Sequence, residues 1–294
     1  MTTVPSPQEI LTEMGLCSPA TIEVISDRVR DRDDVQVLRC QRSGVIFLSR
    51  SDHLSAAQWT EQSGFGYWSA GAREDVLASA RTDDERRADM FGDLVRNRRW
   101  LDVGAGVGGV IEQLRSVARE ITAVEPQPQA REALLNSGYR AVRDLSNLAG
   151  EQFDVVTLFH VFEHLLDPQA TLRQVHELMS TDGRVVIEVP HARDLLLSLL
   201  KVEAFMAFTF WSEHLILHTR ESLTTFLEKA GFRDVSVQGV QRYPLANHLR
   251  WLHSSEPGGH ETWRQLRSPG LDQEYQAMLD RLDATDTIVA TARV

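Results

Sequence analysis

Three glycines in alternate positions follow a short apolar run that carries one acid. Gly104, Gly106 and Gly108 come directly after the run Trp100–Val103, which contains Asp102. Glycine lets the backbone take positive φ and lets a ligand approach where a Cβ would collide. The free N–H groups at the start of a following helix point at the same place. These residues therefore predict a cofactor site at a turn from a strand into a helix.

The glycine pattern by itself fits two cofactors. Residues 104–109 match the dinucleotide pattern G-x-G-x-x-G, and residues 104–108 match the pattern G-x-G-x-G of methyltransferases. Glu125 follows about 20 residues after the first glycine, where a carboxylate can bind the ribose diol of NAD or of S-adenosylmethionine. Asp102 favours the second cofactor, because a carboxylate at this point suits an amino group and a sulfonium better than a pyrophosphate.

A second group of polar residues follows the fourth apolar run, Asp154–Leu158. It lies in the segment Phe159–Pro168, which contains Glu-His-x-x-Asp-Pro from Glu163 onwards. The chain combines this segment with the glycine turn, the two acids and a strand pattern at Thr287–Val294. In this combination it resembles the class I S-adenosylmethionine-dependent methyltransferases. The resemblance is strongest to the group that carries Glu-His-x-x-Asp-Pro after strand four, and it implies S-adenosylmethionine as the cofactor.

The resemblance also implies roles for individual residues. Asp102 is expected to bind the amino group of the cofactor through water, Glu125 the ribose, and Phe159 or His160 to lie near the methyl group. An aromatic residue of Phe65–Trp68 is expected to reach the cofactor or the acceptor, or to pack. The methionine part of the cofactor is expected to contact Gly104, Ala105, Gly106 and Gly108.

His160, Glu163 and His164 are the candidates for catalysis. Methyl transfer is an in-line displacement that depends on alignment, and a base that removes the acceptor's proton adds roughly 10² to 10⁴-fold. The spacing i, i+3, i+4 places the three side chains on one face of a helical turn, where they could also hold a divalent metal. Some quinone O-methyltransferases with this segment have such a site, but His160 stands where their pattern has an acid. Base or orienting chemistry is therefore favoured over a metal, and packing against the cofactor loop is the remaining alternative.

Candidates for contact with the acceptor follow the fifth apolar run. His191 leaves the expected sheet at its ligand-binding edge, and the aromatic segment 205–214 resembles a cover over the active site. We expect His191, Trp211 and His214 to contact the acceptor, and Leu195–Leu200 to form a buried helix. Five further residues could add positive potential and are compatible with an anionic acceptor, such as a nucleotide sugar. They are His218, Arg220, Arg242, His248 and Arg250.

The elements that must position these residues alternate between strand and helix. Asp167 and Pro168 are typical of a helix start, as is Thr219 further along. We predict an α/β fold with a Rossmann-like doubly wound sheet, mostly parallel with an antiparallel C-terminal strand. The expected strands are Trp100–Val103, Ile121–Val124, Asp154–Leu158 and Arg184–Val189, with weaker ones near Ala141, at Asp234–Val240 and at Thr287–Val294.

Two parts of the chain do not follow the alternation. Residues 1–82 are expected to form an N-terminal extension, and residues 83–294 the S-adenosylmethionine-binding methyltransferase domain. Within that domain, a helical insertion is expected at about 241–280. Both additions could cover the ligand.

Composition narrows the function classes. The 294 residues carry a net charge of −11, which opposes binding to nucleic acid, and 42% of them are apolar, as in ordinary globular proteins. Cys17 and Cys40 are too few for a disulfide framework. No membrane-spanning run or signal peptide is apparent, so we expect a cytoplasmic protein without membrane partners.

We therefore expect methyl transfer to a small-molecule acceptor, with a hydroxyl of a sugar or natural product as the first choice. An alternative is C-methylation of a prenyl diphosphate, in which aromatic faces stabilise a carbocation and Glu163 removes the final proton. Alternatives from other classes are an NAD-dependent oxidoreductase and a cofactor-binding protein without catalysis.

Overall fold

A seven-stranded sheet forms the centre of the computed structural model, which describes residues 5–54 and 73–294. The strand order is β10-β11-β8-β7-β4-β5-β6. Only β11 runs antiparallel to its neighbours β8 and β10, which confirms the predicted sheet. The bounds are β4 (Arg99–Val103), β5 (Glu120–Val124), β6 (Arg140–Val142), β7 (Phe153–Phe159), β8 (Met179–Pro190), β10 (Arg233–Val240) and β11 (Thr287–Arg293).

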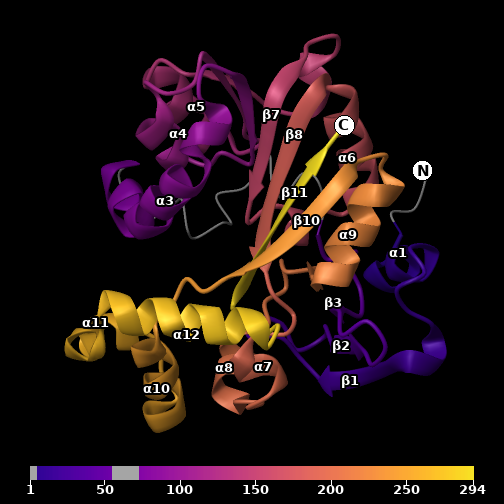
Figure 1. Ribbon diagram of the computed structural model, residues 1–294. Coiled ribbons are helices and arrows are strands. Elements are labelled where there is room, and N and C mark those ends of the chain that lie inside the picture. Colours follow the sequence, from indigo (N-terminus) through magenta and orange to yellow (C-terminus); the bar gives the residue numbers. More distant parts are fainter. Residues whose placement is uncertain (1–4, 55–72) are drawn as a thin grey trace.

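Helices cover both faces of this sheet, as a doubly wound fold requires. In Figure 1, α3, α4 and α5 lie to the left of the sheet, and α6 and α9 lie to its right. The apolar side of α4 is buried against Trp100 and Val155 of the sheet. The bounds are α3 (Arg73–Val95), α4 (Gly109–Leu114), α5 (Pro128–Asn136), α6 (Pro168–Glu177) and α9 (Arg220–Lys229).

The starts of two helices agree with their sequence signals. Asp167 Oδ1 accepts a hydrogen bond from Ala170 N at 2.8 Å, and Pro168 is the first residue of α6. Thr219 caps α9 in the same way through Ser222 N. The acid and the hydroxyl satisfy N–H groups that have no partner inside the helix.

The N-terminal part of the chain forms a second, smaller sheet. It follows the short helix α1 (Pro7–Glu13) and the 3₁₀ turn η1 (Pro19–Thr21), and its order is β1-β2-β3-β9. Strand β9 comes from the distant residues Ile216–Leu217, so the segment after β8 pairs with the N-terminal part. The other strands are β1 (Ile22–Ser26), β2 (Val37–Cys40) and β3 (Ile46–Leu48). Helix α3 continues across residue 82 without a break.

A group of short helices lies at the edge where the parallel strands end (Figure 1). Within Leu195–Leu200 only the first part is a buried helix, because Leu196 and Leu197 are buried whereas Leu199 is 68% exposed. The members of the group are α7 (Leu195–Ser198), α8 (Glu203–Thr209), α10 (Leu245–Ser254), α11 (Gly259–Thr262), η4 (Arg264–Leu266) and α12 (Pro269–Arg281). None of the helices in the described residues is long and apolar enough to cross a membrane.

Candidate functional site

The turn after β4 has the backbone that its glycines predict. Gly104, Gly106 and Gly108 have φ of 71°, 56° and 85°. A Cβ on Gly104 would collide with Val161, and a Cβ on Gly108 would come within 2.6 Å of Leu134. The turn therefore requires glycine both for its conformation and for its close packing.

The neighbouring residue Ala105 helps to hold this turn at the end of β5. Its N–H and that of Gly104 both donate to the Val124 carbonyl, at 3.2 and 2.7 Å. Glu125 follows directly and is buried, and its carboxylate accepts hydrogen bonds from Gly106 N and Gln127 N, each at 2.8 Å. Glu125 thus joins the glycine turn to the end of β5, the position that suits a ribose contact.

Asp102 is buried at the end of β4. Its carboxylate accepts a hydrogen bond from the Thr157 hydroxyl at 2.6 Å, and Thr157 accepts one from Trp100 Nε1 at 2.8 Å. Burial raises the pKa of Asp102 to about 7 although the Thr157 hydroxyl favours its charged form. Burial likewise raises the pKa of Glu125.

Sequence reasoning missed a third carboxylate beside the turn. Asp84 of α3 is 5% exposed and lies where a side chain on Gly109 would stand. Burial raises the pKa of Asp84 to about 6. Asp84 pairs with Arg87 at 3.6 Å. Three buried carboxyls around the glycine turn suit S-adenosylmethionine, because its amino group and sulfonium are positively charged.

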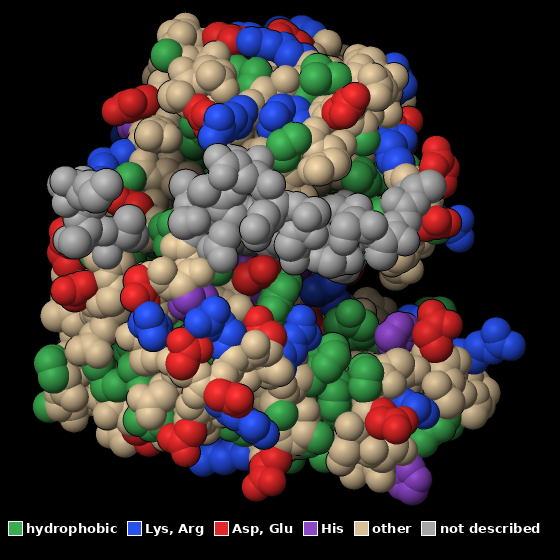
Figure 2. All heavy atoms as spheres, turned by 180° about the vertical axis from the view of Figure 1, so that it is seen from behind, with side chains coloured by type: hydrophobic (Ala, Val, Ile, Leu, Met, Phe, Trp, Pro, Cys, Tyr) green, Lys and Arg blue, Asp and Glu red, His purple; other side chains and the backbone are tan. Residues whose placement is uncertain are grey.

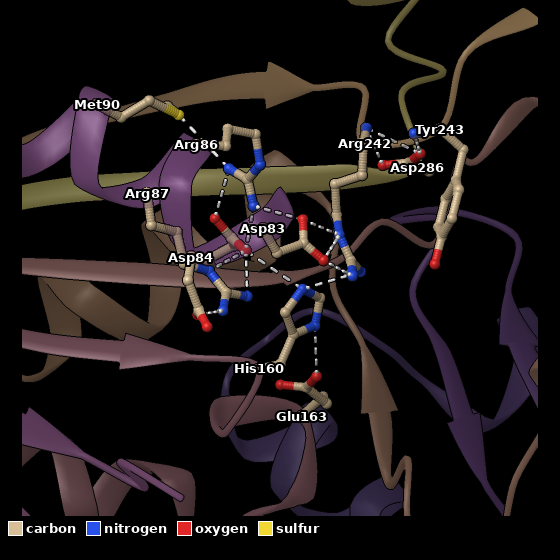
Figure 3. A network of polar contacts seen from close by, with 11 residues as sticks. Asp83, Asp84, Arg86, Arg87, Met90, His160, Glu163, Arg242, Tyr243 and Asp286 are labelled. Carbon is tan, nitrogen blue, oxygen red and sulfur yellow. Dashed lines mark hydrogen bonds and ion pairs between the residues drawn. The ribbon is translucent and has the colours of Figure 1, made fainter. Parts of the chain in front are cut away.

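Figure 3 shows a network of charged side chains in which Asp83, Arg86 and Arg87 of α3 approach His160 and Arg242. Its centre is Glu188 of β8, which is fully buried. Arg86 donates to both carboxylate oxygens at 2.8 and 3.0 Å, and Arg87 donates to Oε1 at 2.7 and 3.0 Å. Although burial disfavours the charge, His160, Arg87 and Arg86 hold the pKa of Glu188 well below its usual range.

His160 lies inside this network. Its φ is 53°, its Nδ1 lies 3.2 Å from Glu163 Oε1, and its Nε2 lies 3.3 Å from Glu188 Oε1. Arg242 Nη1 lies 3.2 Å from the same Nε2, and Arg242 also pairs with Asp83 of α3. Both ring nitrogens of His160 therefore face charged groups, which orient the imidazole.

Glu163, His164 and His214 form a compact group next to His160. The ligand atoms of the three side chains lie within 4.8 Å of one another. His164 Nε2 is 3.8 Å from Glu163 Oε1, and the rings of His164 and His214 are 5.0 Å apart. The local structure is the 3₁₀ turn η3 (Phe162–His164), shorter than the helical face that the spacing predicts. His214 was expected only at the acceptor, yet it joins the catalytic candidates.

The charges of this group follow from burial and proximity. Burial acts against a charged Glu163, but the imidazoles of His164 and His160 hold its pKa at about 2. Burial lowers the pKa of His164, and it lowers that of His214 to about 3 with help from His164. Near neutral pH the group holds one carboxylate and two neutral imidazoles. Such a set is suited to move a proton, and its donor atoms are also of the kind that binds a divalent cation.

A cavity of about 260 Å³ lies beside this group. Its wall includes the three residues that were predicted to contact the methyl acceptor: His191, Trp211 and His214. Figure 2 shows the surface hollowed on this side of the molecule. Phe205, Phe208, Tyr243 and Trp251 contribute further aromatic walls. The polar and charged residues of its lining also include Arg30, Asp194, Arg242, Asn247, His248, His260 and Asp286.

The remaining predicted site residues have defined places. Phe159 ends β7, and the Arg87 guanidinium lies 4.9 Å from its ring centroid. Of the five residues predicted to attract an anion, Arg242 and His248 line the cavity. Arg220 pairs with Asp280 and Asp283, Arg250 with Glu256, and His218 is fully buried. The segment Phe65–Trp68 lies outside the described residues.

Comparison with known proteins identifies the family. A family model described as methyltransferase domain matches residues 74–237. The chain is 25% identical over 233 residues to the mitochondrial ubiquinone biosynthesis O-methyltransferase of Schizosaccharomyces pombe, covering 70% of this chain and 79% of that protein. It is 31% identical over 173 residues to the corresponding enzyme of Xanthomonas euvesicatoria, covering 54% and 72%.

A solved structure with a similar fold is phosphoethanolamine N-methyltransferase 2 of Haemonchus contortus, bound to phosphomonomethylethanolamine and S-adenosylhomocysteine. The TM-score is 0.51 at 16% identity, over 84% of this chain and 62% of that one. The chain belongs to the class I methyltransferase family and uses S-adenosylmethionine. This family membership decides against the oxidoreductase alternative.

The backbone of the glycine turn predicts that Gly108→Ala weakens binding of the cofactor. A residue with a Cβ at this left-handed position costs about 1 kcal/mol, and here it must also displace Leu134. We expect the affinity for S-adenosylhomocysteine, measured by calorimetry, to fall by about tenfold or more. Gly150→Ala is the matched control, because φ is 84° there and nothing lies within 4 Å. Equal affinities of the two variants would contradict a cradle at Gly108.

The pKa of Asp102 predicts a pH-dependent effect of Asp102→Asn. In the folded protein the pKa of Asp102 is raised to about 7, so its carboxyl keeps its proton up to that pH. In the unfolded chain the same carboxyl loses its proton above about pH 4. Wild-type stability therefore falls as pH rises through this window, and the variant escapes that loss. We expect the melting temperature of the variant, relative to wild type, to be higher at pH 8 than at pH 5.

The exposed Asp89→Asn serves as control and should show no such change. Asp102→Asn should also weaken S-adenosylhomocysteine binding, since the ligand's ammonium loses a carboxylate. A melting difference that is the same at both pH values would refute the assignment.

Proposed function

We propose that the chain transfers the methyl group of S-adenosylmethionine to a hydroxyl oxygen of a small natural product held in the 260 Å³ cavity. The observation that carries this proposal is the position of His214. It belongs both to the cavity wall and to the group with Glu163 and His164. A hydroxyl in the cavity therefore has a proton acceptor within the wall that binds it.

The residues of this group have different roles in the proposed reaction. When bound, S-adenosylmethionine supplies a methyl group on a positively charged sulfur. A neutral imidazole, His214 with His164 beside it, takes the hydroxyl proton as the new carbon–oxygen bond forms. The charged Glu163 carboxylate stabilises the imidazolium that results. His160, held by Glu188 and Arg242, orients Glu163 through its Nδ1.

The names of the relatives support oxygen as the atom that is methylated, since they are O-methyltransferases. The aromatic walls support a flat acceptor of the natural-product kind. A prenyl diphosphate is less well supported, because it requires cations for its phosphates. Arg242, one of the two arginines in the described lining, is already paired with Asp83.

Substitutions in the group test the proposal. Catechol serves as the probe acceptor, and the methyl ether is measured by mass spectrometry. We expect His214→Gln and Glu163→Gln each to lower kcat by roughly 10² to 10⁴-fold, the usual contribution of a positioned base. Affinity for S-adenosylhomocysteine should be unchanged.

The exposed His253→Gln on α10 is the control and should retain wild-type turnover. Full activity in both site variants would exclude this group as the base. No methyl ether from wild type with catechol or related phenols would count against a hydroxyl acceptor.

A further inference from the structure

One carboxyl in the wall of the cavity lacks a cationic partner. Asp194 is 4% exposed, and its Oδ1 accepts a hydrogen bond from Leu196 N at 2.6 Å. Among the described residues, no side-chain donor or cation pairs with this carboxyl. A buried carboxylate is normally paired, because removing its charge from water is expensive. A cationic ligand in the cavity would supply the partner that the described residues do not give this carboxyl.

A second carboxyl, that of Asp286, lies in the wall of the same cavity. Asp286 lines the cavity and accepts hydrogen bonds from the backbone N–H groups of Arg242 and Tyr243, at 3.1 and 3.0 Å. His191 is 1% exposed, and its Nδ1 lies 3.0 Å from the Thr285 carbonyl, which accepts the Nδ1 proton. Its Nε2 lies 3.6 Å from Asp283 Oδ1, which also accepts a hydrogen bond from Arg220 Nε. His191 is therefore turned toward Asp283, and the acceptor character of this wall comes from Asp194 and Asp286.

Burial and the charge of Asp286 raise the pKa of Asp194 to about 8. This shift has the direction expected for a buried carboxyl that has a second carboxyl nearby and no cation paired with it among the described residues. A positive group in the cavity would offset it.

The rest of the wall is aromatic. Phe205 and Phe208 pack against Trp251 with ring centroids 5.2 and 5.3 Å apart. The Arg30 guanidinium lies 4.7 Å from the Trp211 centroid, so this wall already accepts one cation on a ring face. Aromatic faces beside a carboxylate attract an ammonium group, whereas Arg242 is held by Asp83 and adds little for an anion.

We propose that the acceptor carries a protonated amine, which Asp194 and the aromatic wall of the cavity hold while a separate hydroxyl of the same molecule faces His214. The ammonium donates to the Asp194 carboxylate, with Asp286 as the neighbouring acceptor. This inference rests on the proposed function, because it takes the cavity as the acceptor site and places the acceptor's hydroxyl at His214.

Binding of three small probes to the full chain with S-adenosylhomocysteine tests the inference. Phenethylammonium, 2-phenylethanol and 3-phenylpropionate share a ring and differ in charge. By calorimetry we expect phenethylammonium to bind at least about tenfold more tightly than the neutral alcohol, and the anion to bind most weakly. A different order, or no binding of any probe in the millimolar range, would overturn the proposal.

Two variants locate the effect. Asp194→Asn keeps an oxygen that can cap Leu196 N, so the fold should persist, and it should abolish the preference for the ammonium without changing affinity for the alcohol. Glu203→Gln removes the same charge from an exposed position of α8 and should leave the preference intact. A preference that survives Asp194→Asn, or is lost in Glu203→Gln, would contradict the assignment.

A last measurement separates this inference from the proposed function. With S-adenosylmethionine present, the nitrogen of phenethylammonium should stay unmethylated, because it lies at Asp194 and not at the base. N-methylated product in the mass spectrum would overturn the inference. Loss of all methyl transfer to phenols with an intact ammonium preference would refute the proposed function alone.

Discussion

The site depends on one buried charge, the carboxylate of Glu188. It is fully enclosed at the end of β8, where Arg86 and Arg87 pair with it and His160 Nε2 lies 3.3 Å away. These partners come from α3 and from the segment after β7. The same contacts that neutralise Glu188 therefore fix the helix beside the glycine turn and the loop that carries the catalytic candidates (Figure 3).

Arg242 extends this arrangement to the helices at the strand ends. It pairs with Asp83 of α3, its Nη1 lies 3.2 Å from His160 Nε2, and it belongs to the segment 241–244 that leads into α10. One network thus connects the cofactor turn, the base group and the cavity wall. In the proposed mechanism the carboxyls beside the glycine turn face the positive cofactor, the neutral imidazoles face the acceptor, and Glu163 supplies the negative charge between them.

Local patterns predicted the scaffold well. Short β-branched runs gave the strands of the large sheet, and the signals at Asp167 and Thr219 marked true helix starts. The glycine turn was predictable because its conformation is a property of a few adjacent residues. The second sheet was not, since β9 pairs residues 46–47 with residues 216–217 and no local pattern encodes such a pairing.

The part of the candidate site that the sequence could predict is the part made of residues adjacent in the sequence. His160, Glu163 and His164 are neighbours in the sequence and remain neighbours in space. Asp84 and Glu188 escaped notice because a charged helix segment normally faces water, and a lone acid in a strand gives no sign of its partners. Their roles follow from the packing of α3 on the sheet, which brings residues about one hundred positions apart into contact.

A crystal structure with bound S-adenosylhomocysteine tests the central claim most directly. Our account predicts that the sulfur faces the His160–His164 segment and that the space beyond it opens into the cavity at His214. It also predicts the amino group beside Asp102 and the ribose at Glu125. A sulfur that points away from His214, or a side chain that closes the path from sulfur to cavity, would contradict methyl transfer to an acceptor held there.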